Sequence, residues 1–560
     1  MKKSRLLAIL LCLVMLFTVV TACNKDNGTQ GTDSTPAASS GAENNTSSSG
    51  GNEAGGGAEN SADAGGSGDG GGESGGGRDT LSMALSGDTG SLDPVTIVTP
   101  IFTAVSCIME PLWDVTEDNE VIMLLAESVD IVAPDEWIVH LRQGVTFSNG
   151  NPFTASDVLF SIQVHAAAGA TGGPRVQTID LDRMKVIDDN TFDLFLWDFH
   201  IANWTVLSQL MIYDEESYTP EGAGLNPIGT GPYILTEYVP NSYINLERRD
   251  DYWGELPAIK YLNFRNLNET SQVVNALETG MIDVGNVAPA DVDFVSRLPG
   301  FDINSRYTGN YIIIGFNFGE NSFFAHNLEA RRAVIHAIDP EAVINLVYEG
   351  EGERMHGCTP DLCFDWEPRF SDLDETYAVG YSVDLAKQYA ESSGLTGQTI
   401  SIMTDGTAAQ VDTAQIIQNM LSAIGVNAEI NNYDPATVWA MLYNPDSVYD
   451  MSVGMGIAPN RRVGDQLVNG VRYSPTLTVP DAFENNMHYL EIAPLTLSTA
   501  DDAKRSDYLF EVLSMYENNV LSYGLCNVLY SIAFSKDIDP ASIVFTIGTG
   551  GVRVLDLKFK

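Results

Sequence analysis

Basic residues are scarce in this chain of 560 residues. It has 29 Lys and Arg against 75 Asp and Glu, which gives a formal net charge of −46. A nucleic-acid-binding surface needs clustered positive charge to meet the phosphates, so this balance excludes nucleic acid as a partner. The same acidity disfavours docking on an anionic bilayer through charge and is typical of a solvated surface that keeps a protein soluble.

Short catalytic and metal-binding motifs are also missing. The sequence contains no G-x-S-x-G nucleophile turn, no H-E-x-x-H zinc motif and no G-x-x-x-x-G-K-[ST] phosphate loop. Its seven histidines include no pair four residues apart that could ligate a metal from one helix face. These absences disfavour a metal site, and they argue only weakly against an enzyme, because catalytic residues can be scattered along a chain.

Cysteine is rare as well, with six residues in all. The four that follow the N-terminal region lack zinc-finger spacing: Cys107, Cys358, Cys363 and Cys526. Cys358 and Cys363 are close enough in sequence to form a small loop disulfide outside the cytoplasm. Free buried thiols are the alternative, and the sequence leaves both open.

The N-terminus has the three parts of a secretory signal. Basic residues come first (Lys2, Lys3 and Arg5), and an apolar run from Leu6 to Val20 follows. That run is shorter than the roughly 20 residues of a membrane-spanning helix. Val20-Thr21-Ala22-Cys23 then resembles a bacterial lipobox. We predict a signal peptide over residues 1–22, lipidation of Cys23, and attachment to the extracytoplasmic face of the cell membrane; a plain secretory signal is the alternative.

Residues 23–78 change composition sharply. After Cys23 they are mostly Gly, Ser, Ala, Asn, Thr, Asp and Glu, with almost no large apolar side chain. Such a segment cannot bury enough surface to offset the entropy of ordering it. We predict a disordered, acidic tether that reaches roughly 40 Å from the membrane.

From Thr80 onward, short β-rich runs alternate with helical stretches, which predicts an α/β fold. We expect strands at 80–85, 137–142, 145–149, 233–239 and 311–318, and helices at 101–113, 329–337 and 408–424. Thr154 and Asp157 have the spacing of a capping box, which starts a further helix. The helix–strand alternation over residues 382–456 resembles a doubly wound sheet.

Several sequence blocks, in a fixed order, resemble the extracytoplasmic solute-binding proteins of family 5, the peptide/nickel-binding group. The most specific is L-R-Q-G-V-T-F-S-N-G-N-P-F-T-A-S-D-V over residues 141–158. N-P-I-G-T-G-P-Y follows at 226–233, A-L-E-T-G-M-I-D-V at 276–284, and I-G-F-N-F at 314–318. A-R-R-A-V-I-H-A-I-D-P-E-A-V-I completes the series at 330–344, so the resemblance runs from about residue 80 to 456.

The resemblance implies a two-lobed, periplasmic-binding-protein-like α/β fold of type II, in the large cluster with an extra subdomain, and a hinge between the lobes. Lobe I would comprise residues 79–306 and 524–560, with the extra subdomain at about 114–225; lobe II would comprise residues 307–523. The chain would be a monomeric receptor of an ABC importer, not an enzyme, and it would need no cofactor. It would capture a small solute, a peptide or similar oligomer, by lobe closure and deliver it to membrane permease subunits.

The resemblance also implies ligand contacts in three places: the turn after the first strand, the loop after residues 449–456, and the return toward lobe I. The residues are Asp88, Thr89, Ile457, Asn460, Arg461 and Tyr523. Peptide-binding relatives often carry an Asp in the second place, where it pairs with the α-ammonium of the ligand. Here residues 456–462 read G-I-A-P-N-R-R without an acid, which puts recognition of a peptide N-terminus in doubt. Arg461 could instead meet a carboxylate, or it could be solvated.

Other functions remain open at this point. Within the same family the solute could be an oligosaccharide, for which Trp113, Trp366 and Trp439 are candidate aromatic platforms, or a nickel chelate. Outside it, the chain could be a lipid-anchored surface hydrolase or a structural lipoprotein without a solute.

Overall fold

The structure is a computed structural model. It describes residues 78–560 except 89, 97–98, 169–174, 177, 198, 321, 372, 374, 445, 458–460, 473–474, 479–480 and 548–550. The predicted signal peptide, the lipidation site Cys23 and the tether up to residue 77 lie outside the described residues, as do Thr89 and Asn460. Arg78, the last residue of the predicted tether, already belongs to the fold, because its guanidinium pairs with Asp283 at 2.6 Å.

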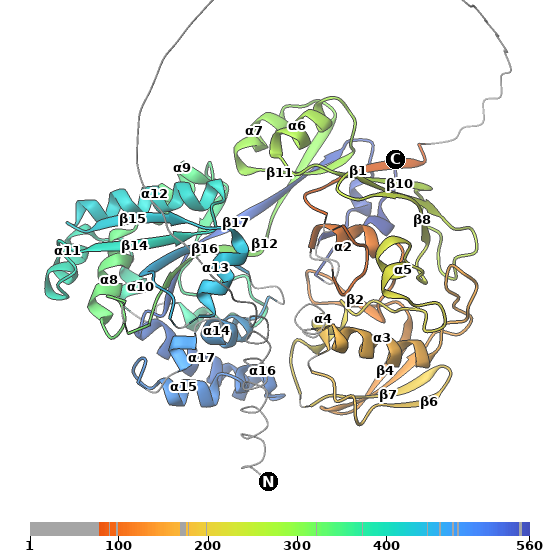
Figure 1. The fold of residues 1–560 in the computed structure, drawn as a ribbon, viewed down its shortest axis with the longest axis horizontal. Coiled ribbons are helices and arrows are strands. Elements are labelled where there is room, and N and C mark those ends of the chain that lie inside the picture. The colour runs from red at the N-terminus through yellow and green to blue at the C-terminus, as the bar shows by residue number, and fades with distance from the viewer. Residues whose placement is uncertain are drawn as a thin grey trace, which may run out of the picture. The chain divides into compact units, whose positions relative to one another are not determined.

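One large mixed sheet organises the chain. Its strand order is β15-β14-β16-β12-β17-β11-β1-β10-β9-β8, and β13 pairs with β17 (Figure 1). Below, the first half means β8, β9, β10, β1 and β11 with their helices, and the second half means β13 to β16 with theirs. Both halves meet at β12 and β17.

The first half is built on β1, which matches the predicted strand. β1 pairs with β10 in parallel. β10 pairs with β9 in antiparallel orientation, and β9 pairs with β8 in the same way. A core cluster beneath this sheet includes Leu81, Phe264 and, from the end of the chain, Leu557. The elements of this half are β1 (Thr80–Leu85), α2 (Thr99–Val105), α5 (Pro220–Leu225), β8 (Tyr233–Val239), β9 (Tyr243–Arg248), β10 (Tyr261–Asn266), α6 (Thr270–Glu278), β11 (Val284–Val287), α7 (Val292–Ser296), β18 (Phe545–Thr546) and β19 (Gly551–Val552).

Residues between α2 and α5 form a separate core around a four-stranded sheet of order β4-β5-β7-β6. The predicted capping box is present: the backbone N–H of Thr154 donates to Asp157 at 2.8 Å and starts α3. This core overlaps the region that the resemblance assigns to an extra subdomain. Its elements are β2 (Trp113–Val115), β3 (Val121–Met123), β4 (Ala126–Ala133), β5 (Glu136–Leu141), α3 (Ala155–Ala167), β6 (Lys185–Asp188), β7 (Thr191–Phe195) and α4 (Asn203–Leu207).

The second half has its own core, which extends from Ile312 to Cys526. β14 is parallel to both β15 and β16, and α12 lies along these strands (Figure 1). Asp339 caps α9 by accepting from the N–H of Glu341, with Pro340 at the first helical position, where proline is favoured. The elements are α8 (Leu328–Ala337), α9 (Pro340–Val347), β13 (Gly352–Arg354), α10 (Glu375–Val379), α11 (Val383–Ser392), β14 (Thr399–Thr404), α12 (Ala408–Ala423), β15 (Asn427–Asn432), α13 (Pro435–Leu442), β16 (Met451–Ile457), α14 (Val463–Arg472), α15 (Asn486–Ile492), α16 (Leu495–Ser498) and α17 (Asp502–Asn518).

Two long antiparallel strands, β12 (Phe301–Phe316) and β17 (Ser522–Ser535), connect the halves. Near their middle, Tyr307 pairs with Leu529 but Tyr311 pairs with Asn527, so three residues of β12 face a single residue of β17. Gly309 lies in this bulge with φ +87°, a conformation that favours glycine. The lobe boundaries expected at 306/307 and 523/524 therefore fall inside these two strands.

Two predicted elements are wrong. The helix expected over 101–113 ends at Val105, and Trp113 instead begins β2. The strand expected over 145–149 is a turn with an isolated bridge between Thr146 and Pro152. In both places a short apolar run has no period long enough to distinguish helix, strand and turn.

Candidate functional site

The strand order in the second half marks a specific edge of the sheet. From β14 the chain crosses through α12 to β15 on one side, and then through α13 to β16 on the other side of β14. Ligands of open α/β sheets bind outside the carboxyl ends of the strands at such a switch point. The candidate site therefore lies at the carboxyl ends of β14 and β16.

At the end of β14, the carboxylate of Asp405 is already engaged. One oxygen accepts from the backbone N–H and the hydroxyl of Thr407, at 3.0 and 2.8 Å, and the other accepts from the amide of Gln410 at 2.8 Å. These bonds fix the loop between β14 and α12. The sequence reading missed Asp405, although an Asp followed two residues later by Thr is a known turn signal.

At the end of β16, the backbone of Ile457 pairs with that of Asn310 in β12. β14 pairs with β16 at Met451 and Ser452, which lie at the start of β16. Met455, further along, has a side chain 49% exposed. The carboxyl half of β16 thus presents an open apolar side chain at the candidate site.

Arg461 lies just beyond this strand, and its guanidinium is engaged with protein groups. It donates to the backbone carbonyl of Glu117 at 3.0 Å and to that of Leu362 at 3.4 Å. It also lies over the ring of Phe364, 5.0 Å from the centroid. The expected role in binding a ligand carboxylate is not the role that Arg461 has in this structure, where it bridges the β2–β3 turn and the second half.

Charged groups around Glu117 are partly desolvated. The carboxylate of Glu117 lies 3.4 Å from the guanidinium of Arg306 in β12. Burial raises the pKa of Glu117, against the opposing effects of Arg306 and Arg461. Burial also lowers the pKa of Arg306 to about 10. Desolvation therefore outweighs the attraction at both partners.

Asp88 follows β1 in the first half, and its carboxylate serves the local turn. One oxygen accepts from the N–H of Gly90 at 2.7 Å and from the hydroxyl of Tyr238 at 2.8 Å, and the other accepts from the N–H of Asn241. These bonds tie the turn after β1 to the β8–β9 hairpin. No hydrogen bond joins Asp88 to Arg461, so the structure does not bring these two predicted residues together.

Tyr523 is a core residue. Only 2% of it is exposed, and its ring packs 5.7 Å from that of Tyr377. Its side chain is therefore not open to a solute in this structure. Among the tryptophans considered as platforms, Trp113 is fully buried and Trp366 is partly buried, whereas Trp439 on α13 is 47% exposed beside Tyr443.

Cys358 and Cys363 are free thiols in the structure, and both are buried, as are Cys107 and Cys526. The loop disulfide that their spacing allowed is not formed. Burial raises the pKa of both thiols well above the ordinary value. They are thus protonated members of the second-half core.

A cavity of about 1320 Å³ is lined by residues of the first half and by Glu127, Arg142 and Gly144 of the separate core, and its lining includes none of the predicted site residues. Its lining includes three cations, each engaged by a protein group. Arg142 donates to the carbonyl of Leu124, Arg553 pairs with Asp556 at 2.9 Å, and Lys558 lies 3.7 Å from Asp539. The strand ends and the cavity are therefore two different candidate places; we favour the strand ends, because they lie at the switch point of the strand order.

Within the described ranges, no group of three or more His, Cys, Asp or Glu side chains could hold a metal ion. In the same part of the chain, no helix has the length and apolar character needed to cross a bilayer.

The sequence of this chain is similar to those of known proteins. The profile of the bacterial extracellular solute-binding proteins, family 5 Middle, matches residues 120–468. The oligopeptide-binding protein AppA of Bacillus subtilis (strain 168) is 24% identical over 365 residues, which cover 60% of this chain and 66% of that protein. The alignment thus spans just under two thirds of this relative.

Solved structures share the fold. AppA from Bacillus subtilis in complex with a nonapeptide has a TM-score of 0.70 at 18% identity, covering 86% of this chain and 99% of that one. NikA from Brucella suis in complex with Fe(III)-EDTA has a TM-score of 0.73 at 19% identity, covering 86% of this chain and 100% of the other. The predicted two-lobed, periplasmic-binding-protein-like α/β fold is confirmed.

Proposed function

Because this chain belongs to the bacterial extracellular solute-binding proteins of family 5, we propose that it captures short peptides outside the cytoplasm and delivers them to an ABC permease. The observation that carries the proposal is the pair of long strands, β12 and β17, which joins two separately cored halves through an irregular segment. Peptide is favoured as the solute by the oligopeptide-binding relative and the nonapeptide-bound neighbour.

The bulge between Tyr307 and Tyr311 supports closure as the mechanism. Ladder hydrogen bonds are interrupted there, and Gly309 adopts a φ that other residues seldom reach, so backbone rotation meets the least resistance at this point. Closing the halves over a solute removes it from water. That desolvation strengthens each polar contact made to the solute's backbone.

Recognition would rest on backbone and apolar contacts more than on the peptide termini. The loop after β16 has no acid for an α-ammonium, and the guanidinium of Arg461 already serves protein carbonyls. Met455 offers an apolar contact at the strand end. Such a site would accept peptides of varied sequence and favour those with apolar side chains.

The proposed location is the outer face of the cell membrane, with lipid on Cys23 and residues 23–78 as the tether. Closure would then present the loaded receptor to permease subunits in the same membrane.

Mass spectrometry of co-purified solute tests the proposal. The full chain carrying Cys23→Ser is purified without denaturation, the solute is released with acid, and the extract is sequenced. We expect peptides in the extract, and a raised melting temperature when the recovered peptides are added back to emptied protein.

Two arginine substitutions give a matched comparison. Met455→Arg places a charge at the candidate site and should reduce the recovered peptide about tenfold, whereas Val448→Arg, at a side chain 80% exposed elsewhere in the same half, should not. Recovery of glycans or metal chelates in place of peptides would contradict a peptide as the solute but would still support a solute receptor. An empty extract, without a thermal shift on addition of peptides, would contradict both the peptide as solute and the receptor function.

A further inference from the structure

We infer that the turn between β2 and β3 is a latch that sets the angle between the two halves beside the irregular segment of β12. The latch comprises Glu117 and Asn119 on the turn, Arg306 on β12, and Arg461 and Arg462 in the second half. This inference rests on contacts within the chain and does not depend on the identity of the solute.

The turn itself is rigidly built. Asn119 donates from its backbone N–H to the carbonyl of Thr116 at 3.0 Å and adopts φ +64°, a left-handed conformation that asparagine tolerates. β18 holds the turn from one side, because the N–H of Glu117 donates to the carbonyl of Phe545 at 3.4 Å and Thr116 forms a bridge with Thr546. These bonds fix the position of the turn relative to β18.

Three contacts leave the turn toward other parts of the fold. The carbonyl of Glu117 accepts from Arg461 at 3.0 Å, its carboxylate faces Arg306 at 3.4 Å, and the side-chain oxygen of Asn119 accepts from Arg462 at 3.3 Å. The turn is thus joined to both the second half and the connecting strand.

The arginine side of the latch is also fixed in place. Arg461 has φ +48°, an unfavourable conformation for a residue with a side chain, and the N–H of Phe364 donates to its carbonyl at 2.9 Å. Both Arg461 and Arg462 lie over the ring of Phe364, at 5.0 and 5.1 Å. Arg306 lies over Phe545 of β18, 3.2 Å from the ring centroid. Each guanidinium is therefore oriented before it meets the turn.

These contacts lie a few residues from the bulge in β12, since Arg306 directly precedes Tyr307. Rotation at the bulge would move the second half relative to the β2–β3 turn, so the bonds from Arg461 and Arg462 to the turn must break before the angle can change. Loss of one charge-assisted hydrogen bond here should lower the ratio of latched to released molecules about tenfold, which corresponds to about 1.4 kcal/mol.

Pulsed electron–electron double resonance between two spin labels measures the ratio of latched to released molecules. Labels at Val132 in β4 and Val448 in the second half lie on side chains 58% and 80% exposed, one in each part. The full chain carries Cys12→Ser and Cys23→Ser; the four remaining thiols are buried and stay unlabelled. The distance distribution is recorded without solute for the parent and for Arg461→Gln and Glu117→Gln.

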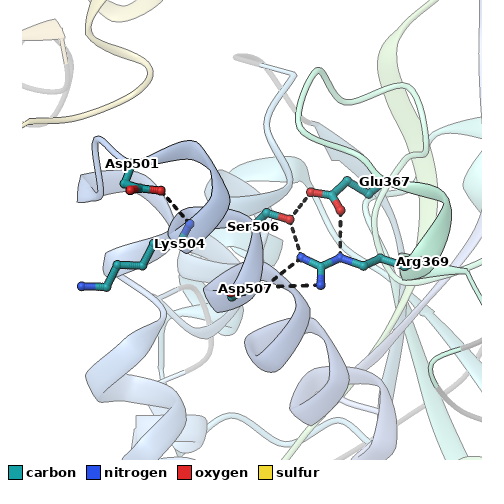
Figure 2. Close-up of polar contacts among 6 residues, drawn as sticks. All are labelled: Glu367, Arg369, Asp501, Lys504, Ser506 and Asp507. Carbon is teal, nitrogen blue, oxygen red and sulfur yellow. Dashed lines mark hydrogen bonds and ion pairs between the residues drawn. The ribbon is translucent and has the colours of Figure 1, made fainter.

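Arg369→Gln is the matched control. Arg369 binds Glu367, Ser506 and Asp507, all within the second half, so it has contacts comparable to those of Arg461 without spanning the halves (Figure 2). We expect Arg461→Gln to shift the distribution toward a second population, Glu117→Gln to do so more weakly, and Arg369→Gln to leave it unchanged. Parent-like distributions for both latch variants would overturn the inference, and so would an equal shift with the control.

Discussion

Asp114 is a buried carboxyl whose ionisation opposes folding. It lies in β2 with 1% exposure, and one of its oxygens accepts from the N–H of Val115 at 2.8 Å. Burial raises its pKa from 3.8 to about 6, against the opposing effects of that N–H and of Arg553. The folded chain therefore holds a proton on Asp114 that the unfolded chain releases at lower pH.

The sign and size of the effect follow from linkage. Between the unfolded pKa of 3.8 and the folded pKa of about 6, the folded state binds more protons, so the free energy of unfolding falls as pH rises through this window. A shift of about two pKa units corresponds to about 3 kcal/mol. Asp114→Asn has no such proton, so its stability relative to the parent should rise by about 3 kcal/mol between pH 3.5 and 7.5.

Urea unfolding followed by tryptophan fluorescence measures this difference. Trp113, Trp137 and Trp204 form one ring cluster around the same strand, so the signal reports on the region of Asp114. Subtracting the parent at each pH removes the titration of every other group. A difference that stays flat across this range, or that falls with pH, would refute the assignment of a raised pKa.

Three further outcomes are expected. Cys23→Ser should release the protein into the medium, and unchanged membrane retention would contradict the lipobox. Gly456→Ala should lower the free energy of unfolding by about 1–3 kcal/mol or more in urea melts, because its Cβ would lie 2.3 Å from the ring of Tyr311; an unchanged midpoint would show that the ring yields freely. Cys358 and Cys363 should resist a thiol reagent at pH 8 in the folded protein and react once it is unfolded, whereas fast reaction in the native state would contradict their burial.

Much of the fold could be predicted from local patterns. The strands Thr80–Leu85 and Tyr233–Val239 have the predicted bounds, and the caps at Thr154 and Asp339 lie where their spacing indicates. Capping and two-residue alternation are properties of a few neighbouring residues, so a sequence carries them directly.

The candidate site could be predicted only in outline. Tyr523 and Asp88 have the right residue types for a cleft, but burial and hydrogen bonding to distant segments decide what each does. The bridge from Arg461 to Glu117 joins residues 344 positions apart, and nothing near either one signals the other. Long-range pairing of this kind depends on the complete topology.

The position of β17 in the sheet has a consequence for how the chain is made. This strand, Ser522–Ser535, pairs with β11 on one side and with β12 on the other, although it lies far beyond both of them in the sequence. A nascent chain that stops short of it has an open gap in the middle of its main sheet, and neither core can close. Folding of the main sheet is thereby delayed until the chain has been synthesised through Ser535, long after β11 and β12 have been made.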